Sequence, residues 1–325
     1  METTSRIKKS KQMLRLVRPI ELSTSDLIYP IFVREDGKKF EIPSMVGQEY
    51  LALNDSVKIC EKVIGLGIPA VMIFGVIGGK DENASVALQK EGFHAQIFRR
   101  LKKEFGDGLV LISNICLCDF THDEYCVYSK NGRVLNEKTA KMLAQIALVH
   151  AEAGADVIAP AAMADGQVHH IRSALDKEGF EEVAIMSYLK TNSCLFQPFY
   201  KTMSQAGTPR TGLDAGKFRI DPLNEKMFLQ KADLDIKEGA DIVIVKPALP
   251  NLDLILRVKQ MYPTTPIAAY QVSGEYAMIK VAAEKGLLNE EASIMETLQS
   301  IKRAGADMIL TYYAMQGAQM LEQQR

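Results

Sequence analysis

The stretch Glu238-Gly-Ala-Asp-Ile-Val-Ile-Val-Lys246-Pro247 decides the fold. It leads from the end of a predicted helix, through a glycine that caps the helix, into an apolar run typical of a buried β-strand. The same signal recurs at Ala153-Gly-Ala-Asp156 and Ala304-Gly-Ala-Asp307, and Leu66-Gly-Ile-Pro69 has the same role before an earlier run. The chain therefore carries a weak internal repeat of one helix-to-strand unit.

Eight strand-like apolar runs alternate with helical patterns along the chain. The runs lie at 27–33, 70–76, 109–117, 156–161, 183–188, 241–247, 266–272 and 307–313. Helical patterns between them include Glu137 to Ala153, Asn224 to Glu238 and Asn289 to Ala304. Such alternation indicates parallel strands covered by helices, and eight units in one chain predict an α/β fold, a (β/α)₈ TIM barrel. A doubly wound open sheet is the alternative, but the glycine-rich turn typical of it does not follow the first run.

This pattern also predicts the domain organisation. Residues 1–25 form an extended N-terminal arm, and residues 26–325 form the barrel that carries the catalytic site. The fifth and sixth runs are joined by a long connection whose first half is rich in Gly, Pro, Thr and Ser, so a lid loop is expected at about 200–222.

Charge and hydropathy exclude two classes of partner. The 39 basic and 40 acidic side chains nearly cancel, so no field would gather nucleic acid or an anionic membrane. No apolar stretch has the length of a membrane span, and the beginning Met-Glu-Thr-Thr-Ser-Arg lacks the apolar region of a signal peptide, so we expect a cytoplasmic protein. The basic segment Arg6 to Arg18 is interpreted as an arm that packs on another subunit or as a solvated face.

Lysines mark the predicted active site. Lys246 ends a buried run at the carboxyl end of a barrel strand, the end at which active sites of this fold lie. Burial favours the neutral amine, which attacks ketones to form a Schiff base. Lys190, just beyond the fifth strand, would add a second cation that disfavours protonation of Lys246. The plain alternative is a lysine that reaches solvent from a strand end.

Three of the five cysteines form the pattern Cys116-x-Cys118-x₇-Cys126 at the end of the third strand. Three thiolates with an open fourth position are a plausible zinc site, and His122 within the loop is a possible additional ligand. A structural role for the cysteines remains the alternative. No Gly-x-Ser-x-Gly motif occurs, so a serine hydrolase has no support.

Long motifs then make the chain resemble a known family. They are Asp26-Leu-Ile-Tyr-Pro-Ile-Phe-Val33, Glu41-Ile-Pro-Ser-Met45, Val245-Lys-Pro-Ala-Leu-Pro250, Ala269-Tyr-Gln-Val-Ser-Gly-Glu-Tyr-Ala-Met278 and Arg303-Ala-Gly-Ala-Asp-Met-Ile-Leu-Thr-Tyr312. On these blocks, which span nearly the whole length, the chain resembles porphobilinogen synthase, also called 5-aminolevulinate dehydratase.

The resemblance implies a lyase that condenses two 5-aminolevulinate molecules into porphobilinogen with loss of two waters, a step of tetrapyrrole biosynthesis. It implies that Lys246 forms the Schiff base with the first substrate molecule, and that Ser273 and Tyr312 hold the carboxylate of that molecule. The cysteines match those of the zinc-type members, which implies a Zn²⁺ cofactor. The resemblance also implies a homo-octamer assembled with the N-terminal arm.

The pocket for the second substrate departs from the family pattern. Carboxylates, a serine and arginines of the family are replaced at Asn114, Ala161, Ala162, Gln167, Tyr200 and Ala215. Lost arginines mean a lost carboxylate clamp, because the guanidinium fork binds a carboxylate through two hydrogen bonds. Arg219 stands where the family has Gln and would compensate in part. Lys190 matches the second family lysine only if one residue is deleted after Tyr188, and a shift by one residue reverses side-chain direction in an extended segment.

Three functions follow from these observations. The first is a divergent porphobilinogen synthase that binds its second substrate through altered contacts. The second is a paralogue that keeps the Schiff-base lysine but acts on a different second substrate. The third is a non-catalytic homologue, which a buried lysine with Ser273 and Tyr312 disfavours because burying such groups is costly.

Overall fold

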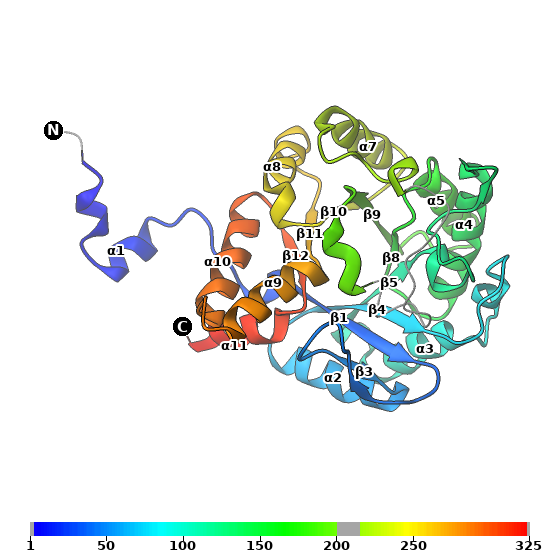
Figure 1. Ribbon diagram of the computed structural model, residues 1–325, viewed down its shortest axis with the longest axis horizontal. Helices are drawn as coiled ribbons and strands as arrows, with labels where there is room; N and C mark the ends of the chain where they lie inside the picture. Colours follow the sequence, from blue (N-terminus) through cyan, green and yellow to red (C-terminus); the bar gives the residue numbers. More distant parts are fainter. Residues whose placement is uncertain (1–2, 200–214, 324–325) are drawn as a thin grey trace.

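Eight parallel strands close into a barrel, with helices on its outer face (Figure 1). The structure is a computed structural model that describes residues 3–199 and 215–323. Pairing of the last strand with the first closes the sheet, which confirms the predicted barrel and excludes the open sheet. In their order around the barrel the strands are β1 (Leu27–Arg34), β4 (Ala70–Val76), β5 (Val110–Ile115), β8 (Val157–Pro160), β9 (Ala184–Lys190), β10 (Ile242–Lys246), β11 (Ile267–Gln271) and β12 (Met308–Thr311).

Each predicted run became one of these strands, and the predicted helices lie between them. Apolar side chains of the helices pack on the outside of the strands, while the strands themselves are buried on both faces. The helices are α1 (Lys11–Leu16), α2 (Leu53–Gly65), α3 (Phe93–Phe105), α4 (Asn136–Glu152), α5 (Gln167–Lys177), α7 (Glu225–Lys237), α8 (Leu252–Met261), α9 (Ser273–Glu284), α10 (Glu290–Arg303) and α11 (Ala314–Gln323).

The Gly-Ala-Asp repeat explains how helices return to the barrel. Gly154, Gly239 and Gly305 have φ angles of +103°, +105° and +113°, a conformation that glycine adopts without the cost a β-carbon would impose.

The aspartate of each repeat then accepts a backbone N–H from the neighbouring strand. Asp156 accepts from Leu111 at 2.9 Å and Asp241 from Ile185 at 2.8 Å, and Asp307 accepts from Ile267 in the same way. The repeat thus fixes the amino-terminal ends of the strands and leaves their carboxyl ends free for the site.

Short elements extend the barrel at its mouth. β3 (Glu49–Leu51) pairs with β1, β2 (Phe40–Glu41) pairs with β3, and β6 (Ser129–Lys130) forms a hairpin with β7 (Arg133–Val134). The 3₁₀ turns are η1 (Ser5–Lys8), η2 (Thr24–Asp26), η3 (Ser85–Leu88), η4 (Gly106–Gly108), η5 (Leu117–Asp119), η6 (Cys194–Phe196), η7 (Ala215–Lys217) and η8 (Leu249–Asn251). Residues 200–214 of the predicted lid, including Tyr200, lie outside the described residues.

The N-terminal segment with α1 lies to one side of the barrel (Figure 1). Its large apolar side chains are exposed, among them Leu16, which is 79% exposed, and Ile7 and Leu14. Across residues 3–199 and 215–323, no helix is long and apolar enough to cross a membrane.

Candidate active site

Lys246 and Lys190 meet at the carboxyl ends of two adjacent strands. Lys246 ends β10 and Lys190 ends β9, and the two residues are partners in the β-sheet register. Only 8% of Lys246 and 4% of Lys190 is exposed, so neither lysine reaches solvent as the plain alternative expects. Because Tyr188 and Lys190 are two residues apart on β9, they point to the same face of the strand. The missing residue after Tyr188 therefore does not turn Lys190 out of the barrel.

The Lys246 amine lies among aromatic rings. Its Nζ atom is 4.6 Å from the ring centroid of Tyr270, 5.0 Å from that of Phe199 and 5.1 Å from that of Phe196. Burial, together with the charges of Lys190 and Arg219, lowers the pKa of Lys246 to about 7. A large part of the Lys246 population is therefore a neutral nucleophile near neutral pH.

Ser273 and Tyr312 line the same aromatic pocket. The Tyr312 hydroxyl is 2.8 Å from the hydroxyl of Tyr270, whose ring lies beside the Lys246 amine. The Ser273 hydroxyl accepts the N–H of Phe199 at 3.0 Å and donates to the carbonyl of Leu195 at 3.3 Å. The segment that supplies Phe196 and Phe199 is thus anchored on Ser273, and it brings both rings over Lys246.

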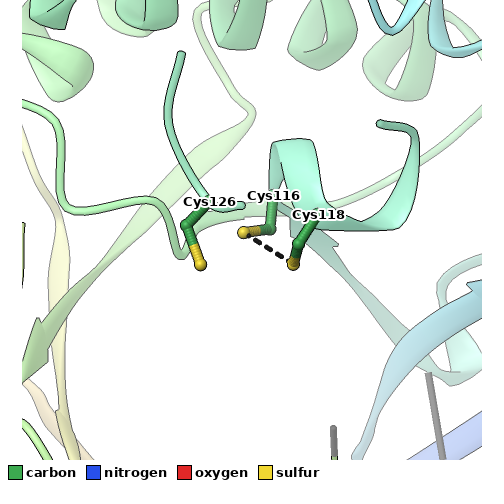
Figure 2. Close-up of side chains that lie close together, drawn as sticks. All are labelled: Cys116, Cys118 and Cys126. Carbon is green, nitrogen blue, oxygen red and sulfur yellow. Dashed lines mark hydrogen bonds between the residues drawn. The ribbon is translucent and has the colours of Figure 1, made fainter. Parts of the chain in front are cut away.

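The three predicted metal-binding cysteines come together beside Lys190. Cys116 and Cys118 lie at η5 and Cys126 in the following loop, and their side chains point toward one another (Figure 2). Their Sγ atoms all lie within 4.8 Å of one another, with 3.1 Å between Cys116 and Cys118. Lys190 donates to Cys126 Sγ at 3.9 Å and to the carbonyl of Ala161 at 2.7 Å.

This cluster fits a zinc ion. A tetrahedral zinc with Zn–S bonds of about 2.3 Å holds its sulfurs roughly 3.8 Å apart, so Cys116 and Cys118, now 3.1 Å apart, would separate slightly while the cluster stays within its 4.8 Å span. Burial raises the pKa of the Cys116 thiol, and contact with the neighbouring thiols raises that of Cys118. These thiols therefore need a nearby positive charge to ionise, and a buried dication would supply it. His122 is exposed, and the group of nearby ligand atoms within the described ranges contains cysteines alone.

Asn114 joins the cysteine cluster to the aromatic pocket. Its side-chain oxygen accepts from the Tyr188 hydroxyl at 3.2 Å, and its amide donates to Asp119 at 3.4 Å. Asp119 is only 4% exposed and also accepts from Cys118 Sγ at 3.6 Å. The family's carboxylate at position 114 is absent, but a buried carboxylate lies one hydrogen bond away.

At three other altered positions, Ala161, Ala162 and Gln167, no polar side chain extends into the pocket. Ala161 and Ala162 are buried and offer only backbone groups. Gln167 begins α5 and uses its side chain locally, donating to the carbonyl of Pro160 at 3.1 Å and accepting from Ala164 at 3.2 Å. It holds the loop after β8 and does not reach the pocket as an arginine would.

Arg219 is the third buried cation at the mouth. It is 7% exposed, donates to the side chain of Asn192 at 3.3 Å, and lies over the rings of Phe196 and Phe218 at 5.4 and 5.3 Å. Because Phe196 also lies beside Lys246, one aromatic ring separates the two cations. The mouth is therefore strongly suited to an anionic ligand.

Sequence reasoning missed Asp119 and the aromatic wall. Asp119 directly follows the Cys-x-Cys pattern, and this position was a usable signal. Phe196, Phe199 and Tyr270 were not predicted, because only polar residues at strand ends were considered as candidates. The first two come from a segment that folds back over the barrel, which no local pattern reports.

Comparisons with known proteins show which family the chain is similar to. A family model described as delta-aminolevulinic acid dehydratase matches residues 1–320. The delta-aminolevulinic acid dehydratase of Methanothermus sociabilis is 43% identical over 311 residues, covering 95% of each chain. That of Bacillus subtilis (strain 168) is 40% identical over 319 residues, covering 97% of each. A crystal structure of the enzyme from Toxoplasma gondii ME49 with the reaction product porphobilinogen has a TM-score of 0.95 at 33% identity, over 100% of this chain and 93% of that chain.

Proposed function

The chain belongs to the delta-aminolevulinic acid dehydratase family, and we propose that it carries out the porphobilinogen synthase reaction at the barrel mouth with Lys246 as the Schiff-base residue. It is a lyase of the dehydratase type. The observation that carries the assignment of Lys246 is its buried amine, whose pKa of about 7 leaves it nucleophilic in neutral solution.

The first step is imine formation. The neutral amine of Lys246 attacks the ketone carbon of one 5-aminolevulinate, the C–N bond forms, and the ketone oxygen leaves as water. The aromatic wall of Phe199 and Tyr270 excludes bulk water from this bond. Ser273 and Tyr312 are placed to bind the carboxylate of that molecule through their hydroxyls once it displaces their present partners.

Zinc is proposed as the metal of the cysteine cluster. Family membership and the buried cluster support a metal-dependent enzyme, and the softness of three thiolates favours zinc. When bound at Cys116, Cys118 and Cys126, it would supply Lewis acidity toward the second substrate. Lys190 contacts Cys126 and would hold a proton beside that site as a second catalytic lysine.

Arg219 is proposed to bind the carboxylate of the second substrate. The chain lacks the family arginines at Tyr200 and Ala215. The guanidinium of Arg219 is buried and contacts the ring of Phe196, which also lies beside the Lys246 amine. A guanidinium binds a carboxylate through two parallel hydrogen bonds, which a lysine or glutamine cannot do.

Assembly and location are also proposals. The exposed apolar side chains of the arm, residues 1–25, support a homo-oligomer, and family resemblance favours an octamer of barrels formed by residues 26–325. The near balance of charge supports small-molecule substrates rather than nucleic acid or membrane, and we propose a cytoplasmic location.

A colorimetric assay for porphobilinogen tests the function. Wild-type protein with 5-aminolevulinate is expected to form the pyrrole, and Arg219→Gln is expected to raise the half-saturating concentration roughly 10- to 100-fold, because a charge-assisted hydrogen-bond pair is lost. Unchanged kinetics in Arg219→Gln would remove Arg219 from the second pocket. Wild-type protein that forms a borohydride-trapped adduct but no pyrrole would instead favour a different second substrate, as the losses at Ala161 and Ala162 allow.

A further inference from the structure

Glu275 is a buried carboxylate between the two loops that carry Lys246 and Ser273. It lies in the first turn of α9, two residues after Ser273, and is 1% exposed. Its Oε2 atom accepts the N–H of Val272 at 2.6 Å, which is the local contact expected of a glutamate at a helix start. Its other contacts are not local.

Those contacts cross to the next strand. Glu275 Oε1 accepts the N–H of Leu249 at 2.6 Å and Oε2 accepts the N–H of Ala248 at 3.3 Å. Both N–H groups lie two or three residues beyond Lys246, and Ala248 is fully buried. One carboxylate therefore ties the end of β10 to the start of α9. This link joins the loop after Lys246 to the helix start that carries Ser273, so it sets the spacing between these two residues of the first-substrate pocket.

Other buried carboxylates of the described part of the chain do not make such a link. Asp235 pairs with Lys231 and accepts from Ser187 at 2.8 Å on the outer side of β9. Asp119 lies at the cysteine cluster. Glu275 alone among the three joins the loop of Lys246 to that of Ser273.

We propose that Glu275 is a positioning residue that sets Lys246 against Ser273. This inference rests on the proposed role of Lys246 and deepens it. Leaving the N–H groups of Ala248 and Leu249 without an acceptor would free the loop after Lys246, and a displacement of about 1 Å at a reacting group lowers catalytic efficiency up to about 100-fold.

The charge of Glu275 has only a small effect on the amine at neutral pH. The pKa of Lys246 depends on the groups around it: Lys190 and Arg219 lower it, whereas Cys126 and Cys116 raise it. The hydroxyls of Tyr188 and Tyr270 also face the amine and stay neutral. Glu275 and Lys246 attract each other electrostatically when both are charged. Burial raises the pKa of Glu275 to about 7, so only part of the Glu275 population is charged in the range where Lys246 titrates. Removing the carboxyl group therefore favours the neutral amine only slightly, and the midpoint of adduct formation should move down by a small amount.

The test compares Glu275→Gln, Glu275→Asp and Asp235→Asn in the full chain. Borohydride trapping of 5-aminolevulinate is measured against pH and substrate concentration. Glu275→Gln is expected to raise the half-saturating concentration roughly tenfold and to move the midpoint of trapping down by less than about 0.5 pH unit. Glu275→Asp keeps the charge but shortens the reach, so its midpoint stays near that of wild type while half-saturation rises. Asp235→Asn, the control for loss of a buried carboxylate, keeps both values.

Amide hydrogen exchange gives a readout that needs no Schiff base. The N–H groups of Ala248 and Leu249 are expected to exchange faster in Glu275→Gln than in Asp235→Asn, in the absence of substrate. Unchanged exchange together with an unchanged half-saturating concentration in Glu275→Gln would overturn the inference. Failure of wild-type protein to form any adduct would refute the role of Lys246, whereas the exchange result would still decide whether Glu275 holds this loop.

Discussion

Lys246→Ala is expected to lower porphobilinogen formation by on the order of 10⁴-fold, because the covalent intermediate is lost while the rest of the pocket stays in place. The reason is positional. The Lys246 Nζ atom is 5.0 Å from the ring centroid of Phe199 and 4.6 Å from that of Tyr270, in a pocket that excludes water. Burial is the main reason that its pKa is about 7. Steady-state rates from the colorimetric pyrrole assay measure the loss.

The matched control is Lys141→Ala, which removes an exposed lysine on α4 and should leave the rate unchanged. Folding should not explain the loss in Lys246→Ala. Removing the amine relieves its partial repulsion from Lys190 and Arg219, which offsets the cost of the cavity left by the shorter side chain, so the melting temperature should stay close to that of wild type. A folded Lys246→Ala protein that keeps its rate within tenfold would contradict the assignment.

Loss of the cysteine cluster is expected to have the second-largest effect. In Cys126→Ala one of three sulfurs within 4.8 Å is gone, and zinc affinity should fall by more than about 100-fold, since even an outer-sphere partner is worth up to that much. Activity should fall with the metal content, and a strong chelator should do the same to wild-type protein. Elemental analysis and the thiolate charge-transfer absorption of the cobalt-substituted protein measure metal binding without relying on activity.

Cys60→Ala is the matched control for this variant, because Cys60 is fully buried on α2 and outside the cluster. It should keep both metal content and rate. If Cys126→Ala retained one zinc per chain with unchanged affinity, or if chelation removed the metal without affecting the rate, the cysteine cluster would not be the metal site of the reaction.

The barrel could be predicted because its determinants are local. The glycines of the Gly-Ala-Asp repeat need a positive φ, and the apolar run that follows each of them is a strand buried on both faces. The aspartate of the repeat was not interpreted, because its partner is the N–H of a neighbouring strand far away in the sequence, such as Ile185 for Asp241.

The site was predictable at strand ends and not beyond them. Lys246 and the cysteines follow from their place after buried runs. The direction of Lys190 did not follow, because it depends on where the missing residue is accommodated; in the structure Tyr188 and Lys190 both lie on β9, two residues apart and on one face. The contacts of Glu275 and Phe199 join segments that are distant in sequence, and only the folded chain brings them together.

The measurement that tests the central claim most directly is the pH dependence of the borohydride-trapped adduct, located by peptide mass spectrometry. Since a group with a lowered pKa becomes neutral as pH rises through that value, the adduct of 5-aminolevulinate should reside on Lys246 and reach half its maximal yield near pH 7. An adduct on Lys190, or a yield on Lys246 that rises only near pH 10 as for an ordinary exposed lysine, would contradict the account.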